Sequence, residues 1–142
     1  VEKGYEGHPV VEVTWFGANA FATFFKYKLP SERAWEKAAR GNSGNRYPWG
    51  DEEPSCREAN SFGCNDGTVS ANTTRGLSTY GVADMAGNVS EWTRNNFHAN
   101  TYVKVVRGGA WDGMNGNLLS YRRENEDPKE STKSLGFRCI KI

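Results

Sequence analysis

The sequence predicts an α+β fold with two helices, short antiparallel strands and a very high loop content. Apolar residues recur at helical spacing in only two stretches, both of which precede Gly41. Residues 42–79 consist almost entirely of turn-forming residues. The sixteen glycines and the aromatic fraction of 13% indicate that large rings, rather than long aliphatic helices, build the core.

Size and composition set the broad class. At 142 residues and 15.8 kDa, we expect one domain that spans residues 1–142 and has a single core. A hydrophobic fraction of 37% and a mean hydropathy of -0.75 argue against membrane insertion. The net charge of +1 gives no electrostatic reason to expect nucleic acid as a partner.

Both expected helices have start or stop signals. Thr14 can cap a helix from about Trp15 to Lys26. Ser31 can cap the second helix, Glu32 favours its positive end, and Gly41 can end it. The apolar face of the first helix consists of Trp15, Ala18, Ala22 and Phe25, and the small-residue face of the second of Ala34, Trp35, Ala38 and Ala39.

Short apolar or alternating runs predict the strands. The expected strands are Val10–Val13, Tyr102–Arg107, Leu118–Arg123 and Phe137–Ile142, and we expect the last to pair centrally. The stretch Tyr80–Trp92 is too irregular for either periodicity and bends at two glycines. Its oxygen-bearing side chains, Asp84, Asn88 and Glu91, indicate that it folds around either a cation or its own turn network.

Three cysteines bear on the compartment. Cys56 and Cys64 lie in one loop-like stretch and can close a short disulfide ring, which would favour the cell surface or an extracellular or periplasmic location. The alternative is three reduced, partly buried thiols, with Cys139 as the third.

Seven ordered blocks carry a family resemblance. They are His8–Trp15, Lys28–Gly41, Tyr47–Gly50, Ala59-Asn60, Asp84–Trp92, Arg107–Trp111 and Gly136–Arg138. The sequence resembles the formylglycine-generating enzyme (sulfatase-modifying factor) family, whose domain is a variant of the C-type lectin fold. The resemblance covers essentially the whole chain. It departs at the start, because family domains carry a further N-terminal portion before the His8 block; the chain is either a shortened version or a piece of a larger protein.

The resemblance implies calcium in the loops. Calcium takes six to eight oxygen ligands from carboxylates, amides and carbonyls. Ligands of the first implied site are the side chains of Asp84 and Glu91 and the carbonyls of Gly87 and Val89. Those of a second implied site, in a shortened loop, are the side chains of Asn60 and Asp66 and the carbonyls of Ser61 and Thr68. We expect a chelator to lower the melting temperature if either site is filled.

The resemblance does not extend to the chemistry of the family's enzymes. Those enzymes oxidise a cysteine with two cysteines of their own that bind Cu(I), a soft ion suited to sulfur. The matching positions here are Gly113 and Leu118, which offer no ligand atom. The iron-dependent sulfoxide synthases of the same superfamily take their iron ligands from a histidine-rich helical domain, whereas this chain has only His8 and His98. We therefore expect no copper and no catalytic residue.

Residues 112–134 then become the candidate binding surface. This segment resembles the hypervariable ligand-binding surface of variable proteins from diversity-generating retroelements, which use the same fold. The implied partner is a protein or peptide. The candidate ligand-binding residues are Asp112, Met114, Asn115, Asn117, Ser120, Tyr121, Arg123, Asn125 and Glu126. Two alternatives stay open: an enzyme of this superfamily with altered chemistry, or an accessory module of a larger protein.

Overall fold

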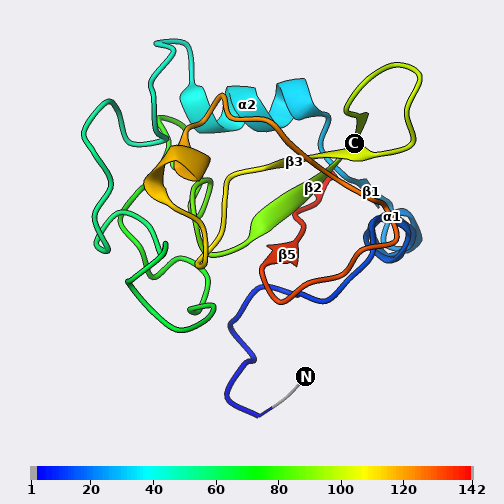
Figure 1. Cartoon of the computed structure of the whole chain (residues 1–142), viewed down its shortest axis with the longest axis horizontal. Helices are drawn as coiled ribbons and strands as arrows, with labels where there is room; N and C mark the ends of the chain where they lie inside the picture. Colours follow the sequence, from blue (N-terminus) through cyan, green and yellow to red (C-terminus); the bar gives the residue numbers. More distant parts are fainter. Residues whose placement is uncertain (1–2, 142) are drawn as a thin grey trace.

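The computed structural model describes residues 3–141 and shows a loop-rich α+β arrangement (Figure 1). Its elements in chain order are α1 (Trp15–Phe24), β1 (Tyr27–Lys28), α2 (Glu32–Arg40), β2 (Ser90–Asn96), β3 (Lys104–Arg107), the 3-10 helix η1 (Asn115–Leu118), β4 (Glu124–Glu126), β5 (Leu135–Gly136) and β6 (Ile140–Lys141). No element interrupts the long course from α2 to β2, which the expected turn composition of residues 42–79 explains.

The strands form two sheets. The larger has the order β4-β3-β2-β5, in which β3 is antiparallel to both β2 and β4, and β5 is parallel to β2. The smaller sheet pairs β1 with β6. The strands β4 and β5 follow each other in the chain but lie at opposite edges of this sheet. The connection between them therefore crosses the sheet, as the orange and red segment of Figure 1 shows.

Local capping fixes both helices as predicted. The Thr14 hydroxyl accepts a hydrogen bond from the Gly17 amide (3.1 Å), and the Ser31 hydroxyl accepts one from the Ala34 amide (3.1 Å). Gly41 forms the C-cap of α2 at a φ of 66°. The first helix ends at Phe24 rather than Lys26, because Lys26 takes the left-handed conformation with a φ of 60°.

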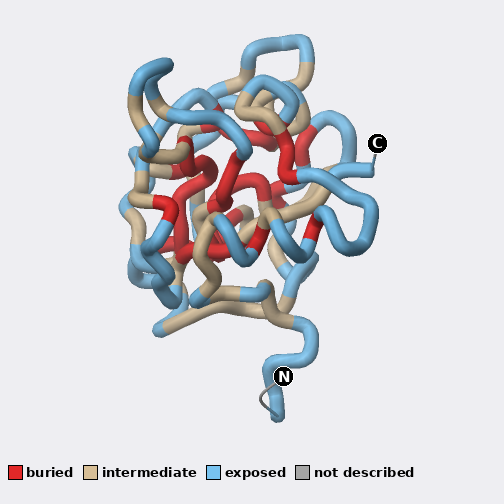
Figure 2. Tube along the Cα trace, turned by 90° about the vertical axis from the view of Figure 1, so that its right-hand side faces the viewer, coloured by how far each residue is buried: buried red, intermediate tan, exposed pale blue. Residues whose placement is uncertain are grey.

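Three rings, Trp35, Tyr47 and Trp92, are the largest hydrophobic residues of the interior, which Figure 2 shows as buried chain at the centre of the molecule. Trp92 packs with Leu29, Val106 and Leu135 between the sheet and α1. Trp35 of α2 packs with Met85, and its indole donates to the Glu91 carboxylate (2.7 Å). The prediction of a core built from rings holds only in part, because Trp35, Tyr47 and Trp92 are the aromatic members of an otherwise aliphatic set of buried hydrophobic residues in the range 3–141.

The fully buried residues of the first helix are small, and Trp15 at its start packs half-buried against the core. Ala18 and Ala22 are fully buried, whereas the Phe24 side chain is 80% exposed. Phe16, Phe21 and Phe25 also keep half or more of their surface in solvent. The helix is therefore apolar on both its buried and its exposed faces.

Two of the expected strands are absent. Residues 10–13 form only an isolated bridge between Val11 and Gly136, because Glu12 at a φ of 54° breaks the extended backbone. Leu118 ends the 3-10 helix instead of starting a strand, since its side chain turns inward and is fully buried. The strand in this region begins at Glu124.

The C-terminal strand was also predicted with the wrong extent. Only Ile140–Lys141 of the expected strand is extended, as β6, which pairs with β1 in the smaller sheet. The strand β5 precedes the expected range and lies at the edge of the larger sheet, so the expected central pairing is wrong. Ile142 lies outside the described residues. The expected strand at Tyr102–Arg107 is confirmed in its second half as β3, and β2 begins inside the stretch predicted to be irregular.

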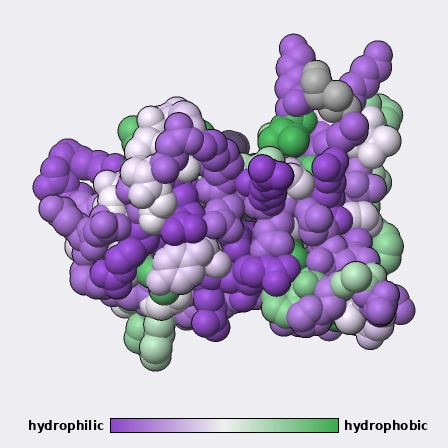
Figure 3. Space-filling model, turned by 90° about the horizontal axis from the view of Figure 1, so that it is seen from above, coloured by the Kyte–Doolittle hydropathy of each residue, from purple (hydrophilic) through white to green (hydrophobic). Residues whose placement is uncertain are grey.

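The surface is largely polar. The face over which α2 runs is predominantly hydrophilic, with apolar residues in scattered patches and at the edge (Figure 3). Within residues 3–141, no helix combines the length and the apolar character that crossing a membrane requires.

Candidate binding site

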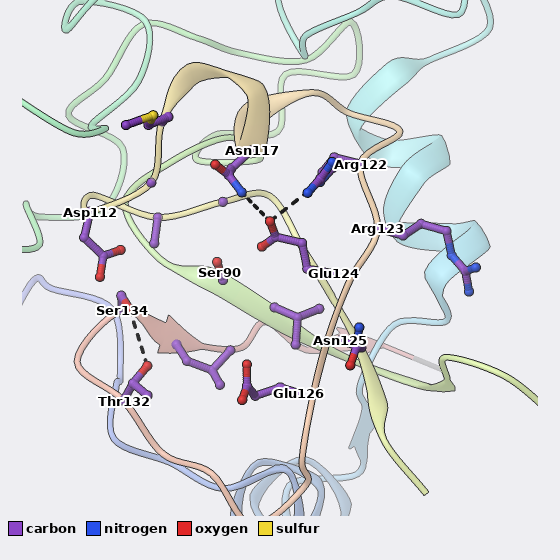
Figure 4. Close-up of a pocket in the computed structure, with 16 residues that line it drawn as sticks. Ser90, Asp112, Asn117, Arg122, Arg123, Glu124, Asn125, Glu126, Thr132 and Ser134 are labelled. Atoms are coloured by element: carbon purple, nitrogen blue, oxygen red, sulfur yellow. Dashed lines mark hydrogen bonds and ion pairs between the residues drawn. The ribbon is translucent and has the colours of Figure 1, made fainter. Parts of the chain in front are cut away.

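An open pocket of about 670 Å³ lies between the larger sheet and residues 112–134. Its lining comes from β2, β3, β4, β5 and the loops around η1. The residues that line it are Ser90, Val106, Gly109, Ala110, Asp112, Gly113, Met114, Asn117, Arg122, Arg123, Glu124, Asn125, Glu126, Thr132, Ser134 and Leu135. Figure 4 shows their polar side chains arranged around this hollow.

A tight glycine turn brings η1 against the end of β3. Gly109 adopts a φ of 68°, which side-chain-bearing residues rarely take. A Cβ atom at this position would lie 2.8 Å from the Asn117 carbonyl oxygen and 3.1 Å from Leu118 Cδ2. The glycine therefore permits the close approach that forms one wall of the pocket.

Arg107 anchors the same region from below. Its fully buried guanidinium donates to the carboxylates of Glu32 (3.2 Å) and Glu36 (2.6 Å) on α2. It also donates to the carbonyl oxygens of Ser120 (3.0 Å) and Tyr121 (3.3 Å). One side chain thus ties the backbone of the pocket segment to both β3 and α2.

Six of the nine predicted ligand-binding residues line the pocket. They are Asp112, Met114, Asn117, Arg123, Asn125 and Glu126. The other three do not. Ser120 is fully buried, and Tyr121 places its ring 5.3 Å from the Arg40 guanidinium, while Asn115 is exposed on η1.

Residues outside the predicted set complete the lining. Ser90 at the start of β2 and Leu135 in β5 become neighbours through the parallel pairing of these strands. Arg122 and Glu124 approach each other at 3.7 Å, and Asn117 donates to the same Glu124 oxygen (Figure 4). Polar character at 122 and 124 was the available signal, because both residues lie inside the segment predicted to bind.

The electrostatics of the pocket are dominated by carboxylates. Burial raises the pKa of the Glu126 carboxyl, and the negative charges of Glu130, Asp127 and Glu124 raise it further. Arg123 does not offset them, because its guanidinium pairs with Glu32 and lies 4.7 Å from the Phe97 ring. Figure 4 shows this side chain directed away from the hollow.

The two positions that match the copper-binding cysteines have different surroundings. Gly113 lines the pocket, whereas Leu118 is fully buried with Tyr47, Ala59 and Ala86. Neither position offers a sulfur atom. Cys139 follows β5 and lies outside the pocket lining, and burial raises the pKa of its thiol.

At the first implied calcium site, protein groups already satisfy the carboxylates. The Arg138 guanidinium donates to both Glu91 oxygens (2.6 Å each) and to the carbonyls of Ala83 (3.2 Å) and Asp84 (3.0 Å). The Asp84 carboxylate accepts from the Asn72 amide (2.7 Å) and the Thr74 hydroxyl (3.0 Å). Arg138 takes the cation's place beside Glu91, so the arrangement of Asp84, Gly87, Val89 and Glu91 does not fit a calcium ion as it stands.

The second implied site is also internally bonded. The side-chain nitrogen of Asn60 donates to the Gly67 carbonyl (2.9 Å), and the side-chain oxygen of Asn60 accepts from the side chain of Asn65 (3.0 Å). The Ser61 carbonyl accepts from the Cys64 backbone amide (3.0 Å), whereas the Asp66 side chain is exposed. Within residues 3–141, no group of three or more His, Cys, Asp or Glu side chains is placed to hold a metal ion. Calcium at either site stays a prediction.

Hydrogen bonds and one close backbone contact tie the stretch Tyr80–Trp92 to the loop before it. The buried Asn88 side chain accepts from the Val69 amide (2.9 Å) and donates to the Val69 carbonyl (3.0 Å). Gly87 allows contact with Asn60, since a Cβ at Gly87 would lie 2.4 Å from the Asn60 carbonyl oxygen. This network holds the loops on which the pocket rests.

A disulfide joins Cys56 to Cys64, whose Cα atoms are 5.4 Å apart. Within the loop that it closes, the Phe62 amide donates to the Gly113 carbonyl (3.0 Å). The side chains of Phe62 and Met114 are both about 70% exposed. The disulfide loop therefore supports the pocket rim at Gly113.

Comparison with known proteins identifies the family. The model of the sulfatase-modifying factor enzyme 1-like domain matches residues 1–142. The chain belongs to this family. The resemblance inferred from the seven sequence blocks is therefore confirmed.

Relatives of this sulfatase-modifying factor domain include kinases and formylglycine-generating enzymes. The chain is 36% identical over 159 residues to serine/threonine-protein kinase Pkn1 of Chlamydia trachomatis, an alignment that covers 99% of the chain and 25% of the kinase. It is 33% identical over 171 residues to the formylglycine-generating enzyme of Streptomyces coelicolor, covering 96% of the chain and 53% of the enzyme. It is 32% identical over 148 residues to inactive C-alpha-formylglycine-generating enzyme 2 of Bos taurus, covering 92% and 49%. The chain thus spans a quarter of the kinases' length and about half that of the other two relatives.

Solved structures share the fold of this domain. Treponema denticola variable protein 1 superposes with a TM-score of 0.84 at 21% identity, covering 96% of this chain and 72% of that one. PvdO from Pseudomonas aeruginosa gives 0.83 at 24% identity, covering 92% and 60%. The major tropism determinant U1 variant gives 0.64 at 14% identity, covering 89% and 36%. The predicted α+β fold of the formylglycine-generating enzyme type is confirmed, and these likenesses concern the fold alone.

Proposed function

We propose that this domain is a non-catalytic binding module that takes a protein or peptide ligand in the pocket of residues 112–134. The observation that carries the proposal is the construction of the pocket. Arg107 and Gly109 fix its backbone, while side chains such as Asn125 and Asp112 stand exposed in its lining. A fixed scaffold of this kind tolerates exchange of the exposed side chains without refolding.

The absence of sulfur at Gly113 and Leu118 supports the non-catalytic part of the proposal. A Cu(I) oxidase needs two thiolates at these positions. Leu118 instead fills a hydrophobic cluster, where its isobutyl group contributes to stability.

Among binding modules, we propose the variable-protein type of diversity-generating retroelements. The fold likeness to Treponema denticola variable protein 1 and to the major tropism determinant supports it. A template copy of residues 107–138 near the gene, differing only at adenines, is the expected finding. If no such copy exists, the retroelement type is wrong while the binding module stands.

A second candidate is an accessory module of a larger protein. The alignment of 99% of the chain with only a quarter of Pkn1 favours it. This candidate assigns the same pocket to binding but predicts further domains in the same gene. An enzyme with altered chemistry is the remaining alternative.

Selection from a random-peptide display library tests the binding function. The change Asn125→Trp places a large ring at an exposed position of the lining, and Lys129→Trp makes the same change at an exposed position outside it. Peptides selected on the wild-type protein should lose binding to Asn125→Trp and keep it to Lys129→Trp. Selected peptides that bind both variants unchanged would show that the pocket is not the binding surface.

Incubation with Cu(I) and a cysteine-containing peptide tests the non-catalytic part. No aldehyde should form. Turnover by the wild-type protein would overturn the argument from Gly113 and Leu118.

A further inference from the structure

We infer that the pocket ligand carries an organic cation, an ammonium or guanidinium group, that the carboxylates of Asp112 and Glu126 receive. This inference rests on the proposed function, since it names the class of ligand for the same pocket. It depends on which charges of the lining are already paired and which are free.

Each positive charge of the lining already lies near a carboxylate. Arg123 forms two hydrogen bonds with Glu32 (2.5 and 3.0 Å) and a third with the Phe97 carbonyl (3.2 Å). Arg122 has its Nε atom 3.7 Å from Glu124. Within the lining, Arg122 therefore faces Glu124, whereas Arg123 is paired with Glu32 outside it.

Two carboxylates stay without such a partner. Neither Asp112 nor Glu126 has a side-chain hydrogen bond or ion pair with any residue of the described range 3–141. Asp112 is exposed at the rim, and Glu126 is half-buried in the wall. Figure 4 shows both on the side of the hollow that also carries Thr132 and Ser134. These hydroxyls can accept further hydrogen bonds from a cationic head group.

The energetics favour a bound cation over an empty site. A half-buried carboxylate without a partner is penalised by partial desolvation, and an opposite charge relieves that cost. The raised pKa of Glu126, caused by burial and then by its acidic neighbours, agrees with an uncompensated negative potential in this wall.

The apolar part of the lining suits the stem of such a ligand. Val106, Ala110 and Leu135 line the pocket and are themselves buried in the fold, so they form its floor. Lysine and arginine side chains lay their methylene groups on apolar surface while the charged head stays with polar partners. A ligand with a charged head and an apolar stem is therefore expected, which describes a lysine or arginine side chain or a free alkylamine.

Titration followed by amide NMR shifts of the full 142-residue chain tests the inference. The probes are Nα-acetylated, C-terminally amidated arginine, lysine, glutamine and glutamate, with butylamine as the free amine and CaCl₂ as the inorganic cation. The arginine or lysine probe should shift amides of residues 112–126 and bind more tightly than the glutamine and glutamate probes. Binding of butylamine as tight as that of the amino-acid probes would indicate a free amine, and weaker binding would indicate a peptide side chain.

Neutral amide replacements test whether these two carboxylates, rather than other surface carboxylates, bind the cationic probe. Asp112→Asn and Glu126→Gln should each weaken binding of the cationic probe by about tenfold, since each removes one charge-assisted hydrogen bond. Glu52→Gln makes the same change in net charge at an exposed position outside the lining and should leave binding unchanged. The amide spectra of the variants report directly whether each remains folded.

The outcomes distinguish this inference from the proposed function. Binding of the neutral or anionic probe at least as tightly as the cationic one overturns the cationic class and leaves the pocket a binding site. Calcium shifting the same amides in place of the organic probes overturns the assignment to an organic cation. If no probe shifts residues 112–126, the cationic class is overturned, and the peptide selection with Asn125→Trp decides the binding function independently.

Discussion

The guanidinium of Arg107 lies 2.6 Å from the Glu36 carboxylate, and this contact joins β3 to α2 beneath the pocket segment. The Arg107 side chain is fully buried, stands 5.3 Å from the Trp35 ring and also bonds the carbonyls of Ser120 and Tyr121. The Arg107 side chain therefore both stabilises the fold and holds the backbone of the pocket segment in place.

Replacing Arg107 should destabilise the fold strongly. Arg107→Met keeps much of the volume but removes the charge and the donors, so we expect the free energy of unfolding to fall by about 3 kcal/mol. The matched control is Arg46→Met, because the Arg46–Glu53 pair (2.9 Å) is exposed and should contribute little to stability. Urea unfolding of the three proteins measures both changes. Equal losses in the two variants would contradict the anchoring role.

The same contact predicts a pH dependence. Burial alone would raise the pKa of the Glu36 carboxyl, but hydrogen bonds from Arg40 and Arg107 and their charges outweigh it and lower the pKa below 4.5. The folded protein then binds fewer protons than the unfolded chain, so this stabilisation is present above a pH of about 4.5 and is lost as the pH falls through the folded pKa. Glu36→Gln should lose less stability than wild type when the pH falls from about 6 to about 3. Parallel stability curves for the two proteins would rule out this linkage.

Local signals and long-range contacts explain what the sequence could and could not predict. Thr14, Ser31 and Gly41 act within a few residues of themselves, so the helices were predicted well. The parallel pairing of Ser90 with Leu135 depends on tertiary contact and leaves no local periodicity. Leu118 has the apolar character of a strand residue, but the close approach at Gly109 places it in a 3-10 helix.

The predicted ligand-binding residues coincide with the pocket lining only in part, for the same reason. The family resemblance located the segment, and six of its nine proposed residues line the pocket. Ser120 and Tyr121 do not line the pocket, because their carbonyls are bound by Arg107 and this fixes their backbone away from the hollow. Ser90 lies far away in the sequence and could be found only from the fold.

The turn at Gly109 offers a matched pair of glycines. Gly109→Ala should destabilise the protein by more than about 1 kcal/mol, because a φ of 68° is unfavourable for alanine and the new Cβ would meet the Asn117 carbonyl at 2.8 Å. At Gly116, a new Cβ would meet no atom of residues 3–141 within 4 Å, so Gly116→Ala should be neutral or slightly stabilising. Thermal unfolding followed by circular dichroism compares them. Similar melting temperatures for both variants would argue against the tight turn.

Glu126 should show a conflict between stability and binding. Since burial and neighbouring carboxylates raise its pKa in the folded state, its ionised form destabilises the fold at neutral pH. Glu126→Gln should therefore raise the melting temperature at pH values near 7 while weakening the cationic probe, and the gain should vanish as the pH falls below about 4.5. Glu52→Gln, at an exposed position, serves as the control for the charge change. A melting temperature lowered by Glu126→Gln at neutral pH would contradict this account.

Arg138 and calcium should compete for the Glu91 carboxylate. Arg138→Gln leaves that carboxylate, which is 5% exposed, without its cation, so we expect the melting temperature to fall by roughly 10 °C in the presence of a chelator. Added calcium should then raise the melting temperature of the variant more than that of wild type, because the ion meets Glu91 without competition from the guanidinium. Differential scanning fluorimetry with EGTA, calcium or magnesium measures these shifts. An equal calcium shift in both proteins would place the ion away from Glu91, and Asp66→Asn then tests the second implied site. No shift in either protein would remove calcium from both sites, leaving Arg138 as the cation around which these loops are built.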